Sequence, residues 1–316
     1  MNKKKAYVVG TNVSTSLSPA IFNYWFEKYK INATYGYKEI KEESFNEEIK
    51  LILKEEGLVG LNITMPYKEK VLPLLKSLDP IAKKLGAVNC ITKKNNSLHG
   101  SNTDGLGFSL ALLAKEIEIT KNWTRSVSKT AIVAGYGGAA KSIIDALRGL
   151  GFENIFVFNR SFEKIRKASK VFNFFPMKLE DLKRVFNCQP VDIVFPSKLD
   201  SDLGPPTKKL NTKFINPDLV VNTIPTNVLE DMEIKRGGRN TSPRTADWVG
   251  CDIVYRPRRG TGFLDYFDRH KSIEGIDMLV HQAAPCFKLW FNVDPGIDGI
   301  DKGLFSLLYK RLEEKK

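Results

Sequence analysis

The sequence is short of cysteine and of long apolar runs. Its 316 residues include four cysteines, which lie far apart at Cys90, Cys188, Cys251 and Cys286. They form no C-x-x-C pair and no spacing typical of a zinc site or a disulfide framework. No apolar run approaches the ~18–20 residues that a membrane span requires, and the apolar stretch at residues 6–10 is too short for a signal peptide. These absences predict a soluble, cytoplasmic protein without a metal site.

Positive charge exceeds negative charge in the chain. Lys and Arg number 49 against 36 Asp and Glu, a formal net charge of +13. Such a balance can indicate nucleic-acid binding. However, most basic residues alternate with acidic ones, and the dense cluster at 235–259 lacks regularly interleaved aromatic residues. Because no helix-turn-helix, RRM or zinc-finger pattern accompanies the charge, we expect a small anionic molecule as the partner, with no nucleic acid and no membrane.

Short apolar segments alternate with helical ones, which is typical of an α/β fold. In the first third we expect strands at 6–10, 34–40 and 58–64, a hairpin of 87–92 and 97–100, and helices that begin at 18, 43, 66 (running to about 75), 80 and 104. We expect later strands at 130–134, 155–158, 191–195, 219–222 and 252–255, a helical carboxy-terminal end, and a linker or loops at 120–129, 197–213 and 235–245.

A glycine-rich turn follows the strand expected at 130–134. The segment fits G-x-G-x-x-A between a strand and a helix. Gly135 allows a tight turn, Gly137 lets backbone N–H groups approach a pyrophosphate, and Ala140 permits close helix–strand packing. An ordinary glycine-rich turn is the alternative, but the flanking strand and helix favour a dinucleotide. We expect the cofactor to be bound by Gly135, Gly137, Gly138, Ala139 and Ala140.

The residues after the next strand predict which dinucleotide is bound. That strand ends in Asn159, Arg160 and Ser161, and Lys164 follows one turn later. An NAD site usually carries an acid at this position, whereas a guanidinium, an ammonium and a hydroxyl can bind a 2′-phosphate. A solvated basic helix start is the alternative. We predict NADP (NADPH) as the cofactor and assign these four residues to it.

Polar side chains recur at the expected strand ends of the amino-terminal half: Ser16, Ser18, Thr64, Lys68, Asn89 and Asp104. Taken singly, the Ser18, Thr64 and Asp104 side chains are plausible helix caps, and Lys68 is a plausible solvated residue of a first helical turn. Taken together, they lie where ligands gather in open α/β sheets.

Nine motifs in this order make the chain resemble the shikimate dehydrogenase family. They are SLSP at 16–19, NITMPYK at 62–68, GAVN at 86–89, NTDG at 102–105, GYGGAA at 135–140, NRS at 159–161, NTIP at 222–225, DIVYRP at 252–257 and MLVHQA at 278–283. The resemblance implies an amino-terminal α/β substrate-binding domain and a Rossmann-type, doubly wound NADP-binding domain. It implies the reversible NADPH-dependent reduction of 3-dehydroshikimate to shikimate, in the route to chorismate and the aromatic amino acids.

The resemblance also implies roles for single residues. Lys68 and Asp104 would form the catalytic pair. The substrate's carboxylate and hydroxyls would be held by Ser16, Ser18, Thr64, Asn89 and Gln282, with Tyr255 lining the site. Hydride transfer to a ketone leaves an alkoxide, which a lysine ammonium can protonate while a neighbouring carboxylate orients the lysine.

The expected domain organisation follows from Gln282, which must reach a pocket otherwise built from amino-terminal residues. We therefore expect a discontinuous catalytic domain, 1–104 and 276–316, and an NADP-binding domain, 105–275, in a monomer or homodimer. Asp277 departs from the family, in which a glycine is common just before MLVHQA, and one extra residue stands between Pro257 and Thr261.

Two alternative functions remain open. One is a dehydrogenase that acts on quinate, or on quinate and shikimate, including one that uses NAD. The other is a non-catalytic NADP-binding regulator, which would have no chemical reason to keep both Lys68 and Asp104.

Overall fold

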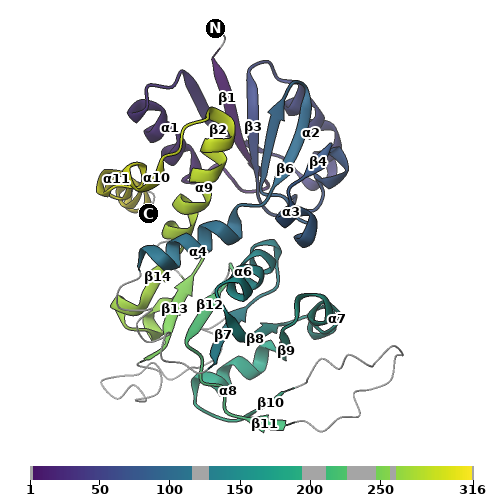
Figure 1. The fold of residues 1–316 in the computed structure, drawn as a ribbon, viewed down its shortest axis with the longest axis vertical. Coiled ribbons are helices and arrows are strands. Elements are labelled where there is room, and N and C mark those ends of the chain that lie inside the picture. Colours follow the sequence, from purple (N-terminus) through teal and green to yellow (C-terminus); the bar gives the residue numbers. More distant parts are fainter. Residues whose placement is uncertain (1–2, 116–127, 194–210, 226–246, 257–260, 315–316) are drawn as a thin grey trace. The chain divides into compact units, whose positions relative to one another are not determined.

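The computed structural model describes residues 3–115, 128–193, 211–225, 247–256 and 261–314 (Figure 1). The chain divides into two compact units. Unit 1 comprises Met1–Phe108 and Met278–Lys316, and unit 2 comprises Ser109–Asp277. The divisions fall inside two helices, α4 (Asp104–Ala114) and α9 (Gly275–Phe291), whereas the sequence led us to expect them after residues 104 and 275.

Unit 1 contains a six-stranded mixed sheet with the order β2-β1-β3-β5-β6-β4. The strands are β1 (Lys4–Gly10), β2 (Ala33–Glu39), β3 (Leu58–Ile63), β4 (Ser77–Leu78), β5 (Cys90–Lys94) and β6 (Ser97–Ser101). Strand β1 is parallel to β2 and β3, whereas β5 is antiparallel to both β3 and β6. The carboxyl ends of β1, β3 and β6 therefore meet the amino end of β5 at one edge of the sheet. We call this edge the polar edge of unit 1.

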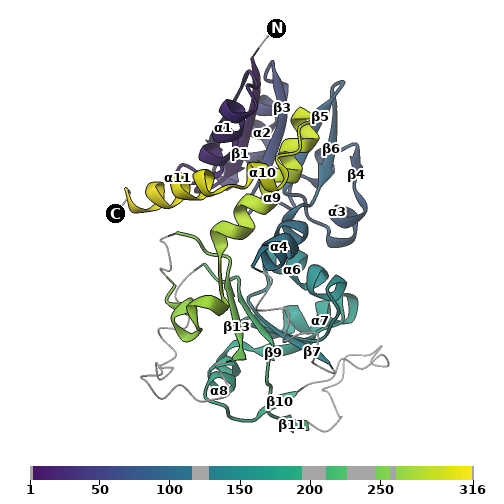
Figure 2. The same cartoon turned by 60° about the vertical axis from the view of Figure 1, so that its left-hand side comes forward.

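Helices cover both faces of this sheet (Figure 2). The helices of unit 1 are α1 (Ser18–Lys28), α2 (Phe45–Lys54), α3 (Pro80–Leu85), α10 (Gly296–Gly299), α11 (Lys302–Glu313) and the unit 1 parts of α4 and α9. Helix α2 buries its apolar side chains against Leu61, Ile63 and Ile91. On the opposite face, the Trp290 indole of α9 donates a hydrogen bond to the Ile91 carbonyl at 3.1 Å. Gly60 makes this packing possible, because a Cβ there would lie 2.2 Å from the indole nitrogen.

Unit 2 contains a six-stranded sheet with the order β14-β13-β12-β7-β8-β9, and every pair in it is parallel. The strands are β7 (Lys129–Ala134), β8 (Phe152–Asn159), β9 (Phe175–Lys178), β12 (Leu219–Asn222), β13 (Val249–Asp252) and β14 (Ser272–Glu274). Counted along the chain from β7, the spatial order is 6-5-4-1-2-3. This is the Rossmann order, in which ligands bind where the order reverses, here between β7 and β12. The predicted fold class is confirmed.

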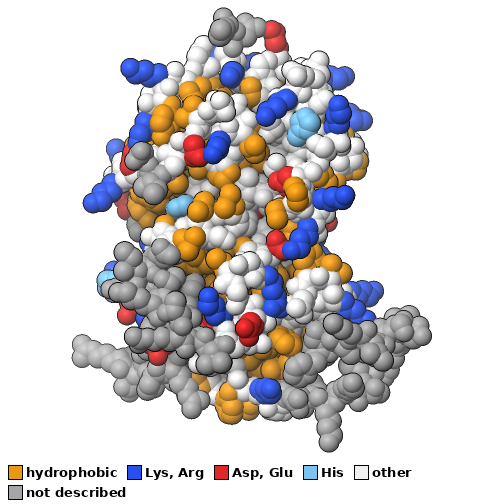
Figure 3. All heavy atoms as spheres, viewed as in Figure 1, with side chains coloured by type: hydrophobic (Ala, Val, Ile, Leu, Met, Phe, Trp, Pro, Cys, Tyr) orange, Lys and Arg blue, Asp and Glu red, His pale blue; other side chains and the backbone are white. Residues whose placement is uncertain are grey.

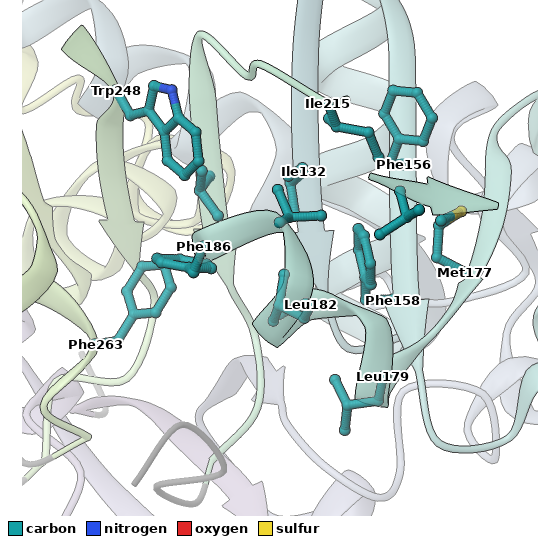
Figure 4. Close-up of a cluster of buried hydrophobic side chains, with 14 of the residues drawn as sticks. Ile132, Phe156, Phe158, Met177, Leu179, Leu182, Phe186, Ile215, Trp248 and Phe263 are labelled. Atoms are coloured by element: carbon teal, nitrogen blue, oxygen red, sulfur yellow. The ribbon is translucent and has the colours of Figure 1, made fainter. Parts of the chain in front are cut away.

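The other elements of unit 2 include helices α6 (Gly138–Gly149), α7 (Phe162–Phe172) and α8 (Leu182–Phe186) and the antiparallel pair β10 (Val191–Ile193) and β11 (Asn211–Lys213). An apolar core lies on one face of the six-stranded sheet. Phe156 and Phe158 are two residues apart on β8 and therefore lie on the same face of the sheet, where they pack with Leu182 of α8 and Ile132 of β7 (Figure 4).

The structure corrects the helix expected from Pro66 to about residue 75. The chain makes turns there, followed only by a short 3-10 helix, Leu72–Leu74. Pro73 contributes to the difference, because it lies in the interior of the expected helix and lacks the N–H donor that an α-helix needs there. Lys68 therefore lies in a turn and not in the first turn of a helix.

Other boundaries also differ from those expected. Ser18 is the first residue of α1, whose N-cap is Leu17. The strand expected at 252–255 is β13, which ends at Asp252, and residues 211–213 form β11 instead of a loop. The short elements β4, α8, β9 and β14 were not expected. The expected loops at 120–127, 197–210 and 235–245 lie outside the described residues, as do residues 257–260.

The described surface matches the charge pattern of the sequence. On the face shown in Figure 3, Lys and Arg side chains are scattered among other types and do not gather into one patch. Among the helices that the structure describes, none is both long and apolar enough to span a membrane. Within the same residues, no group of three or more His, Cys, Asp or Glu side chains is arranged to hold a metal ion.

Candidate active site

The polar edge of unit 1 brings together segments that are far apart in the sequence. The Ile63 amide of β3 donates to the Asn89 carbonyl at 2.8 Å, and the next amide, of Thr64, donates to the Val9 carbonyl at 3.0 Å. The Lys68 carbonyl accepts from the Val88 amide at 2.8 Å. These backbone bonds hold the turn that carries Lys68 against the segment that carries Asn89.

Lys68 and Asp104 form an ion pair at this edge. Lys68 Nζ lies 2.5 Å from Asp104 Oδ2, and the two side chains are 14% and 7% exposed. Asp104 is the first residue of α4, where the helix dipole favours a negative charge. Its other oxygen, Oδ1, accepts from Asn89 Nδ2 at 2.7 Å. The carboxylate is therefore held at both oxygens, and the ammonium is held in one place while still partly open to solvent.

The hydrogen bonds around Asn89 fix the orientation of its amide. Asn89 Oδ1 accepts from the Thr103 backbone N–H at 2.8 Å. Because a backbone N–H can only donate, the atom facing it must be the oxygen. Asn89 Nδ2 then points to Asp104, to Thr103 Oγ1 at 2.9 Å and to Gln282 Oε1 at 3.3 Å. Sequence reasoning missed Thr103, although it lies inside the NTDG motif.

Gln282 reaches the same cluster from α9. Besides the bond to Asn89, its Nε2 donates to the Leu279 carbonyl at 2.9 Å, and its own carbonyl accepts from Thr103 Oγ1 at 3.0 Å. Gly107 of α4 permits this approach, because a Cβ there would lie 2.6 Å from the backbone nitrogen of Gln282. The structure thus brings together Lys68, Asn89, Asp104 and Gln282.

Ser16, Ser18 and Thr64 lie at the same edge but outside this network. Ser16 Oγ donates to Ser18 Oγ at 3.2 Å and accepts from the Ser18 amide at 3.2 Å. Ser16, and not Ser18, therefore satisfies an amide at the start of α1. Thr64 lies against Gly10, where a Cβ would come within 2.5 Å of the Thr64 methyl carbon. Among the residues that the structure describes, no hydrogen bond joins these three side chains to Lys68 or Asp104.

The glycine-rich turn of unit 2 has the geometry that its sequence predicts. Gly135 has φ +99°, which strongly favours glycine, and a Cβ there would lie 2.4 Å from Thr223 Oγ1. Thr223 is held by donating to the Ala134 carbonyl at 2.8 Å. Gly137 precedes α6 and is exposed, and a Cβ there would meet no atom within 4 Å. Open space thus borders the first N–H groups of α6, as phosphate binding at a helix N-terminus requires.

The basic residues expected to select NADP lie beside this turn. The Gly135 amide donates to the Phe158 carbonyl at 2.8 Å, so the end of β8 adjoins the glycine turn. Asn159 ends β8, and the residues that follow, Arg160, Ser161 and Lys164, are exposed. Within the described part of the chain, neither Arg160 nor Lys164 pairs with a carboxylate. The nearby Glu163 instead pairs with Arg166 at 2.8 Å, so its charge is already occupied. These features fit a 2′-phosphate.

Tyr255 belongs to unit 2, in the turn after β13, and is partly buried. The turn is held by Asp252, a buried carboxylate that accepts from the Val254 amide at 3.0 Å, from Asn222 Nδ2 at 3.0 Å and from the Thr261 hydroxyl. Burial raises the pKa of Asp252. Sequence reasoning did not single out Asp252, although it opens the DIVYRP motif.

Comparisons with known proteins agree with this geometry. A family model for the shikimate dehydrogenase substrate binding domain matches residues 8–91. The shikimate dehydrogenase (NADP(+)) of Pelagibacter ubique is 32% identical, and the match covers 94% of this chain and 96% of that protein. The chain belongs to the shikimate dehydrogenase family. The enzyme of the same name from Bartonella quintana is 30% identical over 93% of this chain and 89% of its own length. The resemblance drawn from the nine motifs is confirmed.

Solved structures of shikimate dehydrogenases share the fold. The shikimate 5-dehydrogenase of Thermus thermophilus, in complex with NADP(H) and shikimate, matches with a TM-score of 0.68 at 25% identity. The match covers 98% of this chain and 99% of that one. The Aquifex aeolicus enzyme matches with a TM-score of 0.69 at 24% identity, over 99% of both chains.

Asp277 is the departure from the shikimate dehydrogenase pattern that the structure explains locally. It lies in the first turn of α9, where its Oδ2 accepts from the Glu274 amide at 3.2 Å. Lys115 Nζ lies 3.6 Å from the same oxygen. Asp277 therefore satisfies an amide at the start of the helix that carries Gln282, in the manner of a capping box.

Proposed function

We propose that this protein is an NADP-dependent shikimate dehydrogenase, which reversibly reduces 3-dehydroshikimate to shikimate. The relatives described above carry that name, and the Thermus thermophilus relative binds both ligands. The observation that carries the proposal is the short ion pair between Lys68 and Asp104 at the polar edge of unit 1. It supplies a positioned proton donor for the alcohol, which is the chemistry that ketone reduction requires.

We infer the roles of the catalytic pair from the family resemblance, and its geometry supports them. Lys68 presents its ammonium at a partly open position and donates a proton to the oxygen that becomes the alcohol. Asp104 holds that ammonium through Oδ2 and accepts a hydrogen bond from the adjacent substrate hydroxyl. In shikimate oxidation the proton returns to Lys68. The positive charge also stabilises the alkoxide, and it does so without reorganisation because Asp104, itself held by Asn89, positions the ammonium in advance.

The remaining polar residues of unit 1 hold the substrate in this proposal. Ser16, Ser18 and Thr64 offer hydroxyls at the edge of the sheet, and Asn89 and Gln282 offer amide groups beside the catalytic pair. The 3.3 Å bond between Asn89 and Gln282 is the longer of the two hydrogen bonds that the Gln282 side chain makes. It is therefore the bond that the Gln282 amide exchanges most readily for a substrate oxygen. The family resemblance also assigns Tyr255 to the lining of the substrate site.

NADP is the cofactor that the residues of unit 2 fit. The segment Gly135, Gly137, Gly138, Ala139 and Ala140 would face the pyrophosphate, which the start of α6 would stabilise. Asn159, Arg160, Ser161 and Lys164 would bind the adenine ribose and its 2′-phosphate. When bound, NADPH supplies the hydride for the ketone, and NADP accepts it in the reverse direction.

One assay separates this proposal from its alternatives. The reduction of NADP and of NAD is followed by absorbance with shikimate and, separately, with quinate. We expect turnover with shikimate and NADP. A preference for quinate would instead support the quinate dehydrogenase, whereas NADP binding without turnover of either acid would support the non-catalytic regulator.

We also propose that the enzyme works in the cytoplasm, as a monomer or a homodimer. All four cysteines lie within the described residues and none of them forms a disulfide, which is typical of a reducing compartment. Cell fractionation and light scattering on the purified protein test the two statements separately.

A further inference from the structure

Two cysteines lie directly behind the candidate active site. Cys90 is the residue after Asn89 and begins β5, whereas Cys286 lies one turn after Gln282 on α9. Both are 0% exposed. The mechanism proposed above uses neither of them. Each nevertheless lies next in the chain to, or on the same element as, a residue of the network: Cys90 follows Asn89, and Cys286 lies on α9 with Gln282.

Contacts from two sides place the sulfur atoms together. Asn62 of β3 is opposite Cys90 in the antiparallel register, so the two side chains lie on the same face of the sheet. Asn62 Nδ2 donates to Cys286 Sγ at 3.2 Å, and Thr103 Oγ1 lies 3.4 Å from the same sulfur. Cys286 therefore reaches from α9 to the groups that flank Cys90, and each thiol lies close enough to affect the ionisation of the other.

The two thiols differ in chemical character. Burial opposes ionisation of Cys286, but its polar contacts with Cys90, Thr103 and Asn62 together favour the thiolate, and the pKa of Cys286 is lowered. The pKa of Cys90 is raised well above its usual range, first by burial and then by its hydrogen bond to Cys286. Since the thiolate is the reactive form, Cys286 is the cysteine of this pair that we expect to act as the nucleophile once an oxidant reaches the two thiols.

We propose that Cys90 and Cys286 form an intramolecular disulfide when the protein meets a hydroperoxide, and that this bond reversibly inactivates the site. The Cys286 thiolate attacks the peroxide, takes one oxygen and releases water or an alcohol. The Cys90 sulfur then attacks the resulting sulfenic acid, a second water leaves, and the S–S bond forms. The two thiols are oxidised and the peroxide is reduced. A cellular thiol reverses the reaction by disulfide exchange.

The disulfide would lower the activity because it moves the two elements, α9 and β5, that carry or adjoin residues of the site. A disulfide holds two sulfur atoms closer than two thiols can approach, so α9 and β5 must shift toward each other. Gln282 and Asn89 move with them, and Asn89 in turn holds Asp104. A displacement of about 1 Å at such groups can reduce the catalytic rate on the order of 10²-fold. The effect on activity rests on the function proposed above, whereas the formation of the disulfide does not.

The experiment treats the full-length protein with hydrogen peroxide and maps the cysteine peptides without reduction. We expect one linked peptide pair containing Cys90 and Cys286, a loss of shikimate oxidation on the order of 10²-fold, and recovery with dithiothreitol. Cys286→Ala should stay active after the same treatment. Cys188→Ala is the matched control, because Cys188 is the partly exposed cysteine, in unit 2, and its loss should leave the sensitivity of the enzyme unchanged.

Two outcomes would overturn the proposal: no linked peptide at a peroxide dose that fully oxidises Cys188, or equal inactivation of Cys286→Ala and the wild type. Cys90→Ala provides the same comparison if Cys286→Ala does not fold. If the untreated, reduced wild type has no shikimate dehydrogenase activity, the proposed function fails, and peptide mapping of the wild type still decides whether the disulfide forms.

Discussion

Removal of the Lys68 ammonium is the most direct test of the proposed mechanism. In Lys68→Ala, the Asp104 carboxylate loses the donor that lies 2.5 Å from its Oδ2 and keeps the Asn89 amide at Oδ1. We expect turnover with shikimate and NADP to fall at least ~100-fold, the low end for a positioned acid–base group. Binding of shikimate should change much less, because several other side chains hold the substrate.

The expected loss can be expressed as free energy and compared with the effect on folding. A 100-fold decrease in kcat corresponds to about 2.7 kcal/mol in the activation free energy. Breaking a buried ion pair on one side costs ~3–5 kcal/mol of stability. We expect the lower end of that range or less, because the Lys68 side chain is 14% exposed. Both effects are large enough to measure, and they are measured independently.

A second lysine of the same segment provides a matched control. Lys70 pairs with Glu42 at 2.6 Å, almost as closely as Lys68 pairs with Asp104, but these side chains are 44% and 59% exposed. Such a surface pair contributes ~0–1 kcal/mol, and Lys70→Ala should keep normal turnover. Asp104→Asn should lower kcat and raise the KM for shikimate together, since the carboxylate both orients Lys68 and accepts a substrate hydroxyl.

Initial rates and melting temperatures of the three variants decide the matter. A structural role alone for Lys68 predicts a lower melting temperature with kcat unchanged, and a small added amine would not then affect the rate. A catalytic role predicts a low kcat that added amine partly restores. Near-normal turnover in folded Lys68→Ala would refute the mechanism, however well the other motifs match the family.

The NADP preference, the glycine turn and the carboxy-terminal helix each offer a further test. Arg160→Ala should weaken the binding of NADP by about 1.5–3 kcal/mol while changing the KM for NAD little. Arg166→Ala is the control and should leave the ratio of the two KM values unchanged. Equally weakened binding of NADP and NAD in Arg160→Ala would contradict the assignment. Gly135→Ala should lower the free energy of unfolding by at least about 1–2 kcal/mol, because of its positive φ, and weaken NADP binding; unchanged denaturant unfolding would contradict this. The pKa of Asp301 is lowered to about 2, first by its hydrogen bond from Lys28, so its contribution to stability is present above about pH 4 and is lost as the pH falls toward 2. Asp301→Asn should therefore be less stable at pH 7 and lose less stability between pH 4 and 2, as measured by thermal melts.

Local patterns in the sequence predicted the elements whose formation depends on neighbouring residues. The short helix at residues 80–85 is an example, because Asp79 caps it through the Ala82 amide and Gly86 ends it with φ +61°. The glycine turn is another, since Gly135 is required by the backbone conformation itself. In the same way, the absence of an acidic residue directly after the strand that ends at Asn159 predicts a preference for NADP over NAD from the sequence alone. Each of these signals is complete within a few residues.

The contacts that make a site out of these elements were decided by the tertiary structure. Gln282 bonds to Asn89 across 193 residues, and no local periodicity encodes that distance. The resemblance to the family implied that both residues bind substrate, but it did not indicate that Thr103 sets the direction of the Asn89 amide. Nor did it indicate that Cys286 reaches Cys90.

The turn that carries Lys68 shows the same contrast between what local sequence patterns predict and what the tertiary structure decides. The polar and apolar spacing after Pro66 is compatible with a helix, and the sequence favours one. In the folded chain, the Lys68 carbonyl instead accepts from the Val88 amide, and Pro73 prevents the helix from continuing. The sequence by itself thus determined the residue types, the cap and the end of the helix at residues 80–85, and the order of the strands along the chain. Only the folded sheet decided which of those side chains meet, because hydrogen bonds between distant segments form where the strand ends are brought to one edge.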